Sequence, residues 1–373
     1  DLEFTTGGPV YNRPYNLPDY DTGPAAPLPE YPTDLGKTIL DLISQPEVAS
    51  KDWVIRQYDH EVRGKTALKP IQGPIGKDVP GDSSVLKPVD DSWKGLALTA
   101  DVNPYLMEAN PYHGTMSAVE EVCRNLAAVG ARIDSLADCL CFGNPRKPDI
   151  MGQFKASCEA LRDAAVAVDV PYVSGNVSLY NETADGAIPP TPVLMGVGLV
   201  EDIRNCTTSD MKKDGSIWLI GKTKEEMGAS LYYRSIGKDC PNIPKTDFDS
   251  FIPRMEQLIQ AIEQGEVVAC HDISTGGIAT AVIEMCMSGV GANIRLGEDV
   301  RADVELFSES NGRWIVQVAN DKEKDFARRF DYAIRIGEVG SKVSFSKNNE
   351  IIADFEVEKL RKKWTMPVWD RLA

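Results

Sequence analysis

The pattern of apolar and polar positions predicts alternating strands and helices along most of the chain. Apolar residues recur with the helical period in 114–131 and 150–170, and a glycine near the end of the first segment marks a helix terminus. Short apolar runs at 94–102, 132–143 and 191–202 favour strands. These segments predict a mixed α/β unit that ends near residue 205.

A second α/β unit is predicted after a polar stretch without periodicity at 204–215. Its strands and helices follow one another along the chain, and a helix closes it. The segments expected to form them are 216–223, 247–264, 266–272, 276–289, 312–320 and 357–364. The sequence therefore predicts two α/β domains, with bounds at 36–205 and 206–373.

The segment before these domains differs from both. Residues 1–35 are rich in Pro, Gly, Tyr and Asp and show no periodicity, which is typical of an extended linker. A short amphipathic helix is expected over 34–45. Because a native protein seldom starts in this way, we expect that the chain is cut from something longer.

Composition narrows the class of protein. The 373 residues carry a net charge of -16, and 42% of them are hydrophobic, as in an ordinary globular protein. Such a charge argues against binding to nucleic acid or anionic membranes, although it leaves room for a phosphorylated small molecule. No apolar run has transmembrane length and no signal-like N-terminus is seen, so a cytoplasmic protein is expected.

Cysteine and histidine usage indicates neither a disulfide framework nor a histidine-rich metal site. The eight cysteines include no CxxC pair, which favours reduced, mainly structural thiols. The three histidines, His60, His113 and His271, are far apart and lack zinc-ligand spacing. The "LIGKT" segment lacks the spacing of a phosphate-binding loop, because a strand replaces the residues of the cradle.

Oxygen-bearing side chains near strand ends are the candidates for hard-metal and phosphate chemistry. Asp138 lies in an apolar strand, where its carboxylate needs a partner, either a ligand or a structural hydrogen bond. The segment "VSGNVSLYNET" appears where a core strand is expected. It offers Gly175 for close backbone approach and the side chains of Asn176, Ser178 and Glu182 for binding, but it also fits a simple turn.

Two further polar segments lie in the second unit. "CHDISTGG" leads from a strand into a helix, which suits a phosphate beside Asp272, or a plain N-cap formed by Asp272 or Ser274. In "LFSESNGRW", Glu309 and Arg313 are candidates for a structural ion pair.

Seven segments, taken in order, resemble one family. "NRPY", "QYDHEV", "NPYHG", "ADCLCFGNP", "GNVSLYNET", "HDISTGGIA" and "ESNGRW" resemble the C-terminal half of the phosphoribosylformylglycinamidine synthase family. That family belongs to the aminoimidazole ribonucleotide synthetase superfamily. The resemblance implies an α/β two-domain unit. Its first domain would be a mixed sheet with helices that forms a barrel-like, dimer-type interface, and its second an α/β sandwich.

The resemblance also implies an activity. The reaction would convert formylglycinamide ribonucleotide, ATP and ammonia from glutamine into formylglycinamidine ribonucleotide, ADP and phosphate, with ATP and Mg²⁺ as cofactors. Carried over to this chain, Asp138 and Gly175 would contact ATP, Asn176 would bind magnesium and Ser178 would contact the ribonucleotide. The implied partners are the first half of the synthetase, a glutaminase subunit and a small accessory subunit.

The first-half motifs of that family are altered here. Asp101 stands where the family has its proton-accepting histidine, and Asn125 replaces a metal-binding acid, so no catalytic residue is expected in this half. A degenerate auxiliary nucleotide site is expected around six residues, namely His60, Asp101, Asn103, Arg124, Asp272 and Glu309.

Alternative readings remain at this point. The chain could be a non-catalytic nucleotide-binding scaffold, or a self-sufficient small-molecule kinase or synthetase of the same superfamily. Asn125 counts against the second alternative. A homodimer in which a second copy replaces the missing half is also left open.

Overall fold

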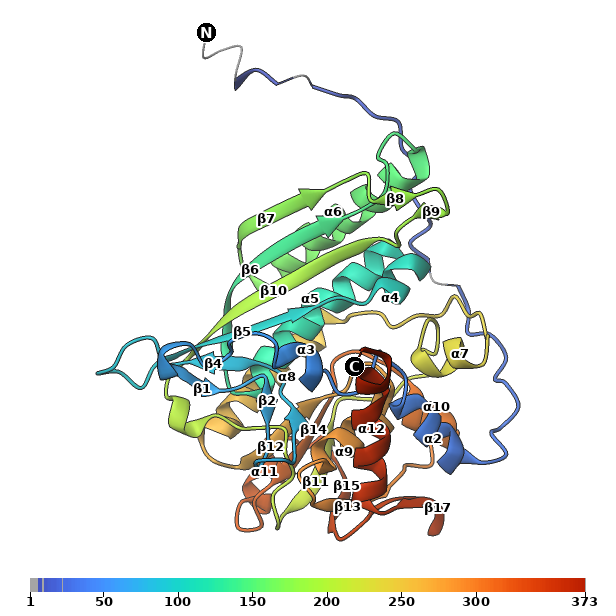
Figure 1. The fold of residues 1–373 in the computed structure, drawn as a ribbon. Coiled ribbons are helices and arrows are strands. Elements are labelled where there is room, and N and C mark those ends of the chain that lie inside the picture. The colour runs from blue at the N-terminus through green and yellow to red at the C-terminus, as the bar shows by residue number, and fades with distance from the viewer. Residues whose placement is uncertain (1–5, 9, 22, 373) are drawn as a thin grey trace.

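The computed structural model describes residues 6–8, 10–21 and 23–372, and the chain forms two large sheets with helices packed on them (Figure 1). Residues 1–5, 9 and 22 of the expected linker lie outside this description. Within the described ranges, no helix combines the length and the hydropathy that crossing a membrane requires.

The first sheet has six strands in the order β1-β4-β5-β10-β6-β7. Their bounds are Thr66–Leu68 (β1), Ser84–Leu86 (β4), Gly95–Asp101 (β5), Arg132–Cys141 (β6), Tyr172–Ser178 (β7) and Thr191–Val200 (β10). Only β6 and β7 run parallel to each other. One face is covered by helices, namely α4 (Pro104–Ala109), α5 (Pro111–Ala128) and α6 (Pro148–Val168) (Figure 1). The described chain places no helix on the opposite face, which we call the open face.

Glycines on β10 let α5 lie close to this sheet. A Cβ atom on Gly196 would lie 2.3 Å from Val122 Cγ1 of the helix, and one on Gly198 would lie 3.2 Å from Leu126 Cδ2 of the same helix. Contacts this short are not available to larger residues. The helix face that meets them is fully buried, with Val122 and Leu126 at 0% exposure.

The second sheet has seven strands in the order β12-β14-β11-β15-β13-β16-β17, and only β13 and β16 are parallel. The bounds are Ser216–Ile220 (β11), Val267–Asp272 (β12), Gly291–Arg295 (β13), Trp314–Val318 (β14), Ile334–Gly340 (β15), Val343–Lys347 (β16) and Glu350–Phe355 (β17). The helices near this sheet are α2 (Leu35–Ile43), α7 (Leu231–Ser235), α8 (Phe248–Glu263), α9 (Gly277–Cys286), α10 (Ala302–Phe307), α11 (Glu323–Arg329) and α12 (Val357–Leu372). The prediction of a two-domain α/β fold is confirmed.

The remaining elements are short. They are α3 (Asp52–Ile55), the strand pair β2 (Ile71–Gln72) and β3 (Val79–Pro80), the strand pair β8 (Glu182–Thr183) and β9 (Gly186–Ala187), and two 3-10 turns at Val62–Gly64 and Ile203–Asn205.

Both faces of the second sheet are buried at β11, which explains the continuous apolar run of this strand. Ile217 and Leu219 point into a core built with α2, α9, α10 and α12, whereas Trp218 and Ile220 point into a core shared with α8 and α5. Since α5 also packs on the first sheet, the second core is continuous across the two domains.

The N-terminal segment lies against both domains. The ring of Tyr20 stacks on Tyr112 with 4.6 Å between centroids, and its hydroxyl donates to Glu159 on α6 at 2.5 Å. The helix α2 was assigned to the first domain by its place in the sequence. In the structure it instead packs into the core of the second domain, through Ile39 and Leu42 among others.

Two local predictions need correction. The segment 172–178 is neither a core strand nor a turn, because β7 is the edge strand of the first sheet and most of its residues are exposed. The helix α9 is capped by neither Asp272 nor Ser274. Gly276, with φ +83°, takes the N-cap position, and no side chain caps the helix. Glycine adopts this left-handed conformation without strain.

Candidate functional site

The first group of candidate residues lies on the parallel strands β6 and β7. Their register pairs Asp138 with Gly175, Cys139 with Asn176, and Cys141 with Ser178. Successive residues of a strand point to opposite faces of the sheet. The strands therefore bring these candidates side by side but distribute their side chains over two faces.

Asp138 and Gly175 lie on the helix-covered side. Asp138 pairs with the buried Leu194 of β10, and a Cβ atom on Gly175 would lie only 2.7 Å from Asp138 Oδ2. The missing side chain of Gly175 thus leaves the space that the carboxylate occupies. Burial raises the pKa of Asp138, and the backbone N–H of Asn176, which donates to the carboxylate, opposes this. The partner expected for Asp138 is thus at least in part a structural hydrogen bond.

Asn176 and Ser178 lie on the open face. The Asn176 amide Nδ2 is 3.5 Å from Cys139 Sγ, and the residue is exposed. Ser178 contributes its backbone oxygen to the amide of Asn181 at 2.7 Å. Glu182 lies farther along, where it accepts from Lys147 Nζ at 3.0 Å.

These residues fit magnesium only in part. Asn176 offers one neutral amide oxygen, which is a suitable ligand type, but magnesium needs about six oxygens around it. The carboxylate of Asp138, its neighbour across the strands, points to the other face. A magnesium ion at Asn176 therefore needs further oxygens from a bound phosphate group or from another polypeptide.

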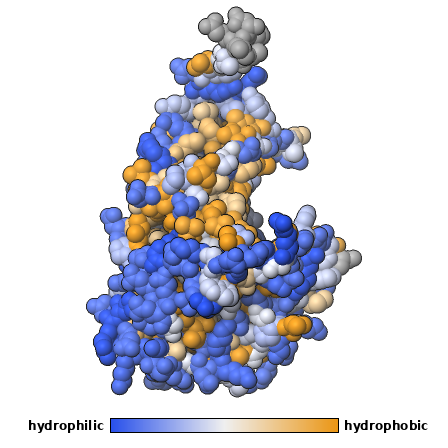
Figure 2. Space-filling view, turned by 90° about the vertical axis from the view of Figure 1, so that its left-hand side faces the viewer, coloured by the Kyte–Doolittle hydropathy of each residue, from blue (hydrophilic) through white to orange (hydrophobic). Residues whose placement is uncertain are grey.

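The open face around Asn176 is apolar. Met195 and Leu199 of β10 are 39% and 45% exposed, and they lie in register with Ala100 and Leu96 of β5. Figure 2 shows apolar residues gathered over the upper part of the molecule, where the first sheet lies, and a mostly hydrophilic lower part. A large exposed apolar sheet face is typical of an interaction surface.

A second group of candidates forms a buried charged network where the domains meet. Arg124 of α5 is 1% exposed, and its Nε donates to Asp272 Oδ2 at 3.0 Å. Its two terminal nitrogens face Glu120, which accepts a hydrogen bond, and Glu121, which is 3.4 Å away. The guanidinium is thus surrounded by carboxylates from both domains.

Asp101 lies at the margin of this network. Its carboxylate hydrogen-bonds with the side chain of Glu121, and its Oδ2 has no partner within the described residues. Burial, together with the charge of Asp272, raises the pKa of Asp101 to about 6. Burial and the charge of Asp101 raise the pKa of Glu121 well above its usual range. The two carboxyl groups are therefore arranged to share a proton.

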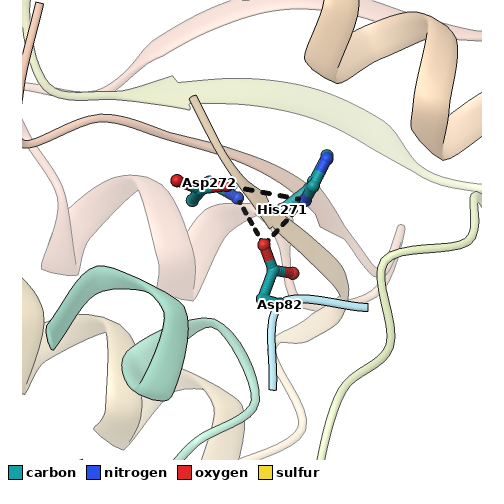
Figure 3. Close-up of side chains that lie close together, drawn as sticks. All are labelled: Asp82, His271 and Asp272. Atoms are coloured by element: carbon teal, nitrogen blue, oxygen red, sulfur yellow. Dashed lines mark hydrogen bonds and ion pairs between the residues drawn. The ribbon is translucent and has the colours of Figure 1, made fainter. Parts of the chain in front are cut away.

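His271 connects this network to a further pair of carboxylates. Its Nδ1 is 2.7 Å from Asp82 Oδ1 (Figure 3). Its Nε2 is 3.1 Å from Glu284 Oε2. Burial disfavours the imidazolium, but Asp82 and Glu284 outweigh burial and raise the pKa of His271 well above its usual range. Asp82, His271 and Asp272 are close enough to hold a cation. With both ring nitrogens bonded to carboxylates, the imidazolium itself supplies that positive charge.

The remaining residues of the expected auxiliary site are dispersed. Glu309 accepts from the backbone N–H groups of Gly276 at 2.8 Å and Leu231 at 2.9 Å, and burial raises its pKa to about 7. Asn103 caps α4, and it shares a pocket of about 170 Å³ with Glu309. His60 Nδ1 lies 3.2 Å from the backbone oxygen of Tyr58. Within the described residues, no hydrogen bond or ion pair joins His60 to the other residues of the expected auxiliary site.

The expected ion pair between Glu309 and Arg313 does not form. Arg313 donates instead to neutral oxygens, those of Ser308 at 2.6 Å, Ser310 at 2.8 Å and Thr223 at 2.9 Å. The polar segment 308–313 thus satisfies a buried arginine through its own backbone, which the order of residues did not reveal.

Sequence reasoning missed four carboxylates of the network, namely Asp82, Glu120, Glu121 and Glu284. A signal existed for two of them. Glu120 and Glu121 precede Arg124 by four and three residues on a predicted helix, which is the spacing of helical ion pairs. Asp82 lies in a loop and pairs across 189 positions, so no local pattern marks it.

Two family models match the chain. The N-terminal domain of AIR synthase related proteins matches residues 80–200, and the C-terminal domain of the same proteins matches residues 209–346. These ranges contain most of the first and second sheets, and together they span more than half of the chain. The chain therefore belongs to the AIR synthase related proteins.

Within that class, the chain is similar to proteins named phosphoribosylformylglycinamidine synthase subunit PurL. It is 35% identical over 387 residues to the one from Methanothrix thermoacetophila, a match that covers 98% of this chain and 48% of that protein. It is 40% identical over 343 residues to the one from Thermococcus sibiricus, covering 89% and 46%. The chain spans about half the length of the curated relatives it matches.

Solved structures share the fold. T. maritima PurL complexed with FGAR superposes with a TM-score of 0.69 at 17% identity over 88% of this chain and 54% of that one. PurLQS from Thermotoga maritima gives 0.61 at 19% identity over 77% and 48%. The hydrogenase maturation protein HypE in complex with ATP gives 0.53 at 17% identity over 70% and 85%. At such low identity these likenesses show the fold alone.

Proposed function

We propose that this chain is one two-domain unit of an ATP-dependent phosphoribosylformylglycinamidine synthase. In this proposal it is the second of two tandem units, and it contributes nucleotide, magnesium and substrate contacts to a site shared with the first. The similarity to PurL proteins along 98% of the chain, against 48% of the relative, supports this role. The single structural observation that carries it is the pair formed by the exposed Asn176 and the half-buried Ser178 on an uncovered apolar sheet face.

The site residues have distinct parts in this proposal. Asn176 would hold magnesium, which neutralises charge on the transferred phosphate. Asp138 of β6 and the backbone of Gly175 on the edge strand β7 would contact ATP, and Gly175 allows close approach. Ser178 lies two residues beyond Asn176 on the same face, a position from which its hydroxyl would orient the ribonucleotide.

The proton acceptor and the remaining magnesium ligands would come from the first unit. Asp101 stands where the family resemblance expects a histidine, and it is tied to Glu121 inside the buried network. Arg124 is likewise occupied by carboxylates and has no free edge for a phosphate. These observations support a structural role for this region. They also support the proposal that this unit contributes no catalytic residue. The pocket lined by Asn103 and Glu309 is the observation that supports nucleotide binding at the auxiliary site.

The open face suggests the arrangement of the complete enzyme. Covering Met195, Leu199 and their neighbours with the equivalent sheet of another two-domain unit would remove apolar area from water and close a barrel-like interface. We propose the first tandem unit as that partner, with a second copy of this chain as the alternative. A glutaminase subunit and a small accessory subunit are further proposed partners, supported by the similarity to PurLQS.

The proposal is tested by measuring ADP release with ATP, magnesium, ammonium and formylglycinamide ribonucleotide. We expect activity when the chain is mixed with a separately produced first unit, and none from the chain alone. Loss of even an outer-shell group costs a metal site about 10- to 100-fold, so Asn176→Ala should lower the rate at least about 100-fold.

Ser174→Ala is the matched control, because Ser174 is exposed on the same strand and the same face, two residues before Asn176. It should leave the rate unchanged. Substrate-dependent activity from the chain alone would instead favour a self-sufficient homodimer. An unchanged rate in Asn176→Ala would remove Asn176 from the site.

A further inference from the structure

A cationic groove lies on the second domain, away from the strands that carry Asn176. Two adjoining hollows, of about 450 Å³ and about 140 Å³, share Lys222 and Arg254 in their walls. Lys224 and Lys245 also line the smaller hollow. Four cations therefore gather at one place on a chain whose net charge is -16.

The groove is built from firmly placed segments. The strand β11 ends at Ile220, and the next residue, Gly221, has φ +92°. A Cβ atom on Gly221 would lie 2.3 Å from the backbone oxygen of Gly312, so this turn is pressed against the loop before β14. The backbone N–H of Lys224 donates to Ser310 Oγ at 3.1 Å. Arg254 projects from the helix α8 on the other side.

The cations of the smaller hollow are poorly neutralised by the protein. Among the described residues, Lys222 and Arg254 have no carboxylate within 4.0 Å, whereas Lys224 and Lys245 have only long ion pairs of 3.6 and 3.8 Å. One carboxylate, Asp247, lines this hollow, and it already accepts hydrogen bonds from Ser250. Clustered like charges repel one another, so this hollow has a positive potential that attracts an anion.

The larger hollow has a different chemistry. Leu219, Val300 and Ile334 provide apolar walls, and the ring of Tyr332 lies 5.7 Å from the guanidinium of Arg254. The carboxylate of Asp299 lines it as well, together with Glu305, whose Oε1 accepts from Gly297 at 2.7 Å. Such a cavity suits a ring with an apolar face and with hydroxyl or amine groups that donate to carboxylates.

We propose that this groove binds a small phosphate monoester with a cyclic, hydroxyl- or amine-bearing body. The phosphate occupies the smaller hollow between the four cations, and the ring lies beside Tyr332 in the larger one. Lys222 and Arg254 lie between the two parts and contact both. Because side-chain cations neutralise the phosphate, binding here requires no metal ion.

The experiment is calorimetric titration of the full chain with AMP and with ribose 5-phosphate, in a buffer that contains EDTA. We expect at least one of them to bind, and adenosine to bind at least about tenfold more weakly than AMP, since a charge-assisted hydrogen bond contributes about 1.5–3 kcal/mol. Absence of binding by both phosphate esters overturns the proposal.

Variants locate the site. Lys222→Ala should weaken binding by about tenfold or more, and Lys222→Arg, which keeps the charge, should retain it. Lys213→Ala is the matched control, because it removes one exposed lysine outside the groove and changes the net charge equally. An equal loss in Lys213→Ala would show unspecific charge attraction and overturn the proposal.

The result is separable from the proposed synthase function. Asp138→Asn, on the first sheet, should leave binding in EDTA unchanged, since that site depends on magnesium. A loss of binding in Asp138→Asn would assign the ligand to the first sheet and overturn the proposal that it binds in the groove. Groove binding by a chain that fails the ADP-release experiment would overturn only the synthase proposal.

Discussion

Replacing Arg124 by methionine should destabilise the whole molecule. The side chain is 1% exposed, and its guanidinium contacts Asp272 of the second domain at 3.0 Å and Glu120 and Glu121 of its own helix. Methionine retains the apolar volume but leaves these carboxylates without their cation. Removing one member of a buried ion pair costs about 3–5 kcal/mol. With more than one carboxylate left uncompensated, we expect a loss of about 4 kcal/mol in the free energy of unfolding.

The assay is equilibrium unfolding in urea, followed by tryptophan fluorescence. Trp314 is a local reporter, because its Nε1 donates to the backbone oxygen of Arg124 at 3.0 Å. Arg162→Met is the control, since Arg162 is exposed and pairs with its neighbour Asp163, and exposed pairs contribute about 0.2–1 kcal/mol.

The dependence of this loss on pH tests its cause. Burial raises the pKa values of Glu120 and Glu121, and Arg124 opposes this. Without the arginine their folded-state pKa values lie farther above those of the unfolded chain, so the folded state binds more protons and its stability falls as pH rises. The deficit of the variant should therefore be larger at neutral pH than in mild acid. Adding Asp272→Asn should recover about 0.5–3 kcal/mol. A loss below about 1 kcal/mol at neutral pH would refute the reasoning, because that is the size of a surface pair.

Three further predictions follow from single contacts. Gly175→Ala places a Cβ atom 2.7 Å from Asp138 Oδ2, so ADP release by the two-unit mixture should fall while Ser174→Ala has no effect. His271 has a raised pKa, so its stabilising contribution is complete below the unfolded-state value of about 6.5 and is lost as pH rises through the folded-state value. Urea unfolding of His271→Gln should thus show a deficit that shrinks in alkaline buffer, and a deficit that grows with pH would contradict the assignment. Gly196→Val should lower the free energy of unfolding by about 1–3 kcal/mol, because the new side chain crowds Val122 of α5. A melting temperature that stays unchanged would show that the helix can move away.

Much of the fold follows from local patterns. The periodicity of 114–131 and 150–170 predicted the helices now seen at Pro111–Ala128 and Pro148–Val168, and the apolar run at 216–223 predicted the buried strand Ser216–Ile220. These predictions succeeded because burial on one helix face, or on both faces of a strand, leaves a regular mark on neighbouring positions.

Predictions that depended on partners far along the chain were less successful. The helix Leu35–Ile43 was recognised, but its assignment to the first domain was wrong, because an amphipathic helix shows that it buries one face without showing against what. The pairing of Glu309 with Arg313 failed for a related reason. Glu309 accepts from the backbone N–H of Gly276, 33 positions away, and Arg313 donates to the backbone oxygen of Ser308 in its own loop.

By itself, the sequence determined the two α/β units, the order of most of their strands and helices, and the polar segments that identify the family. Only the tertiary structure decided that β7 is an exposed edge strand, that Asp138 and Asn176 point to opposite faces, and that Arg124 joins the two domains through Asp272. The reason is physical. Backbone preference and amphipathic period act over a few residues, whereas desolvation and charge pairing depend on what surrounds a group in space. Asp82 and His271, 189 positions apart, show that such surroundings need not leave a trace in local sequence.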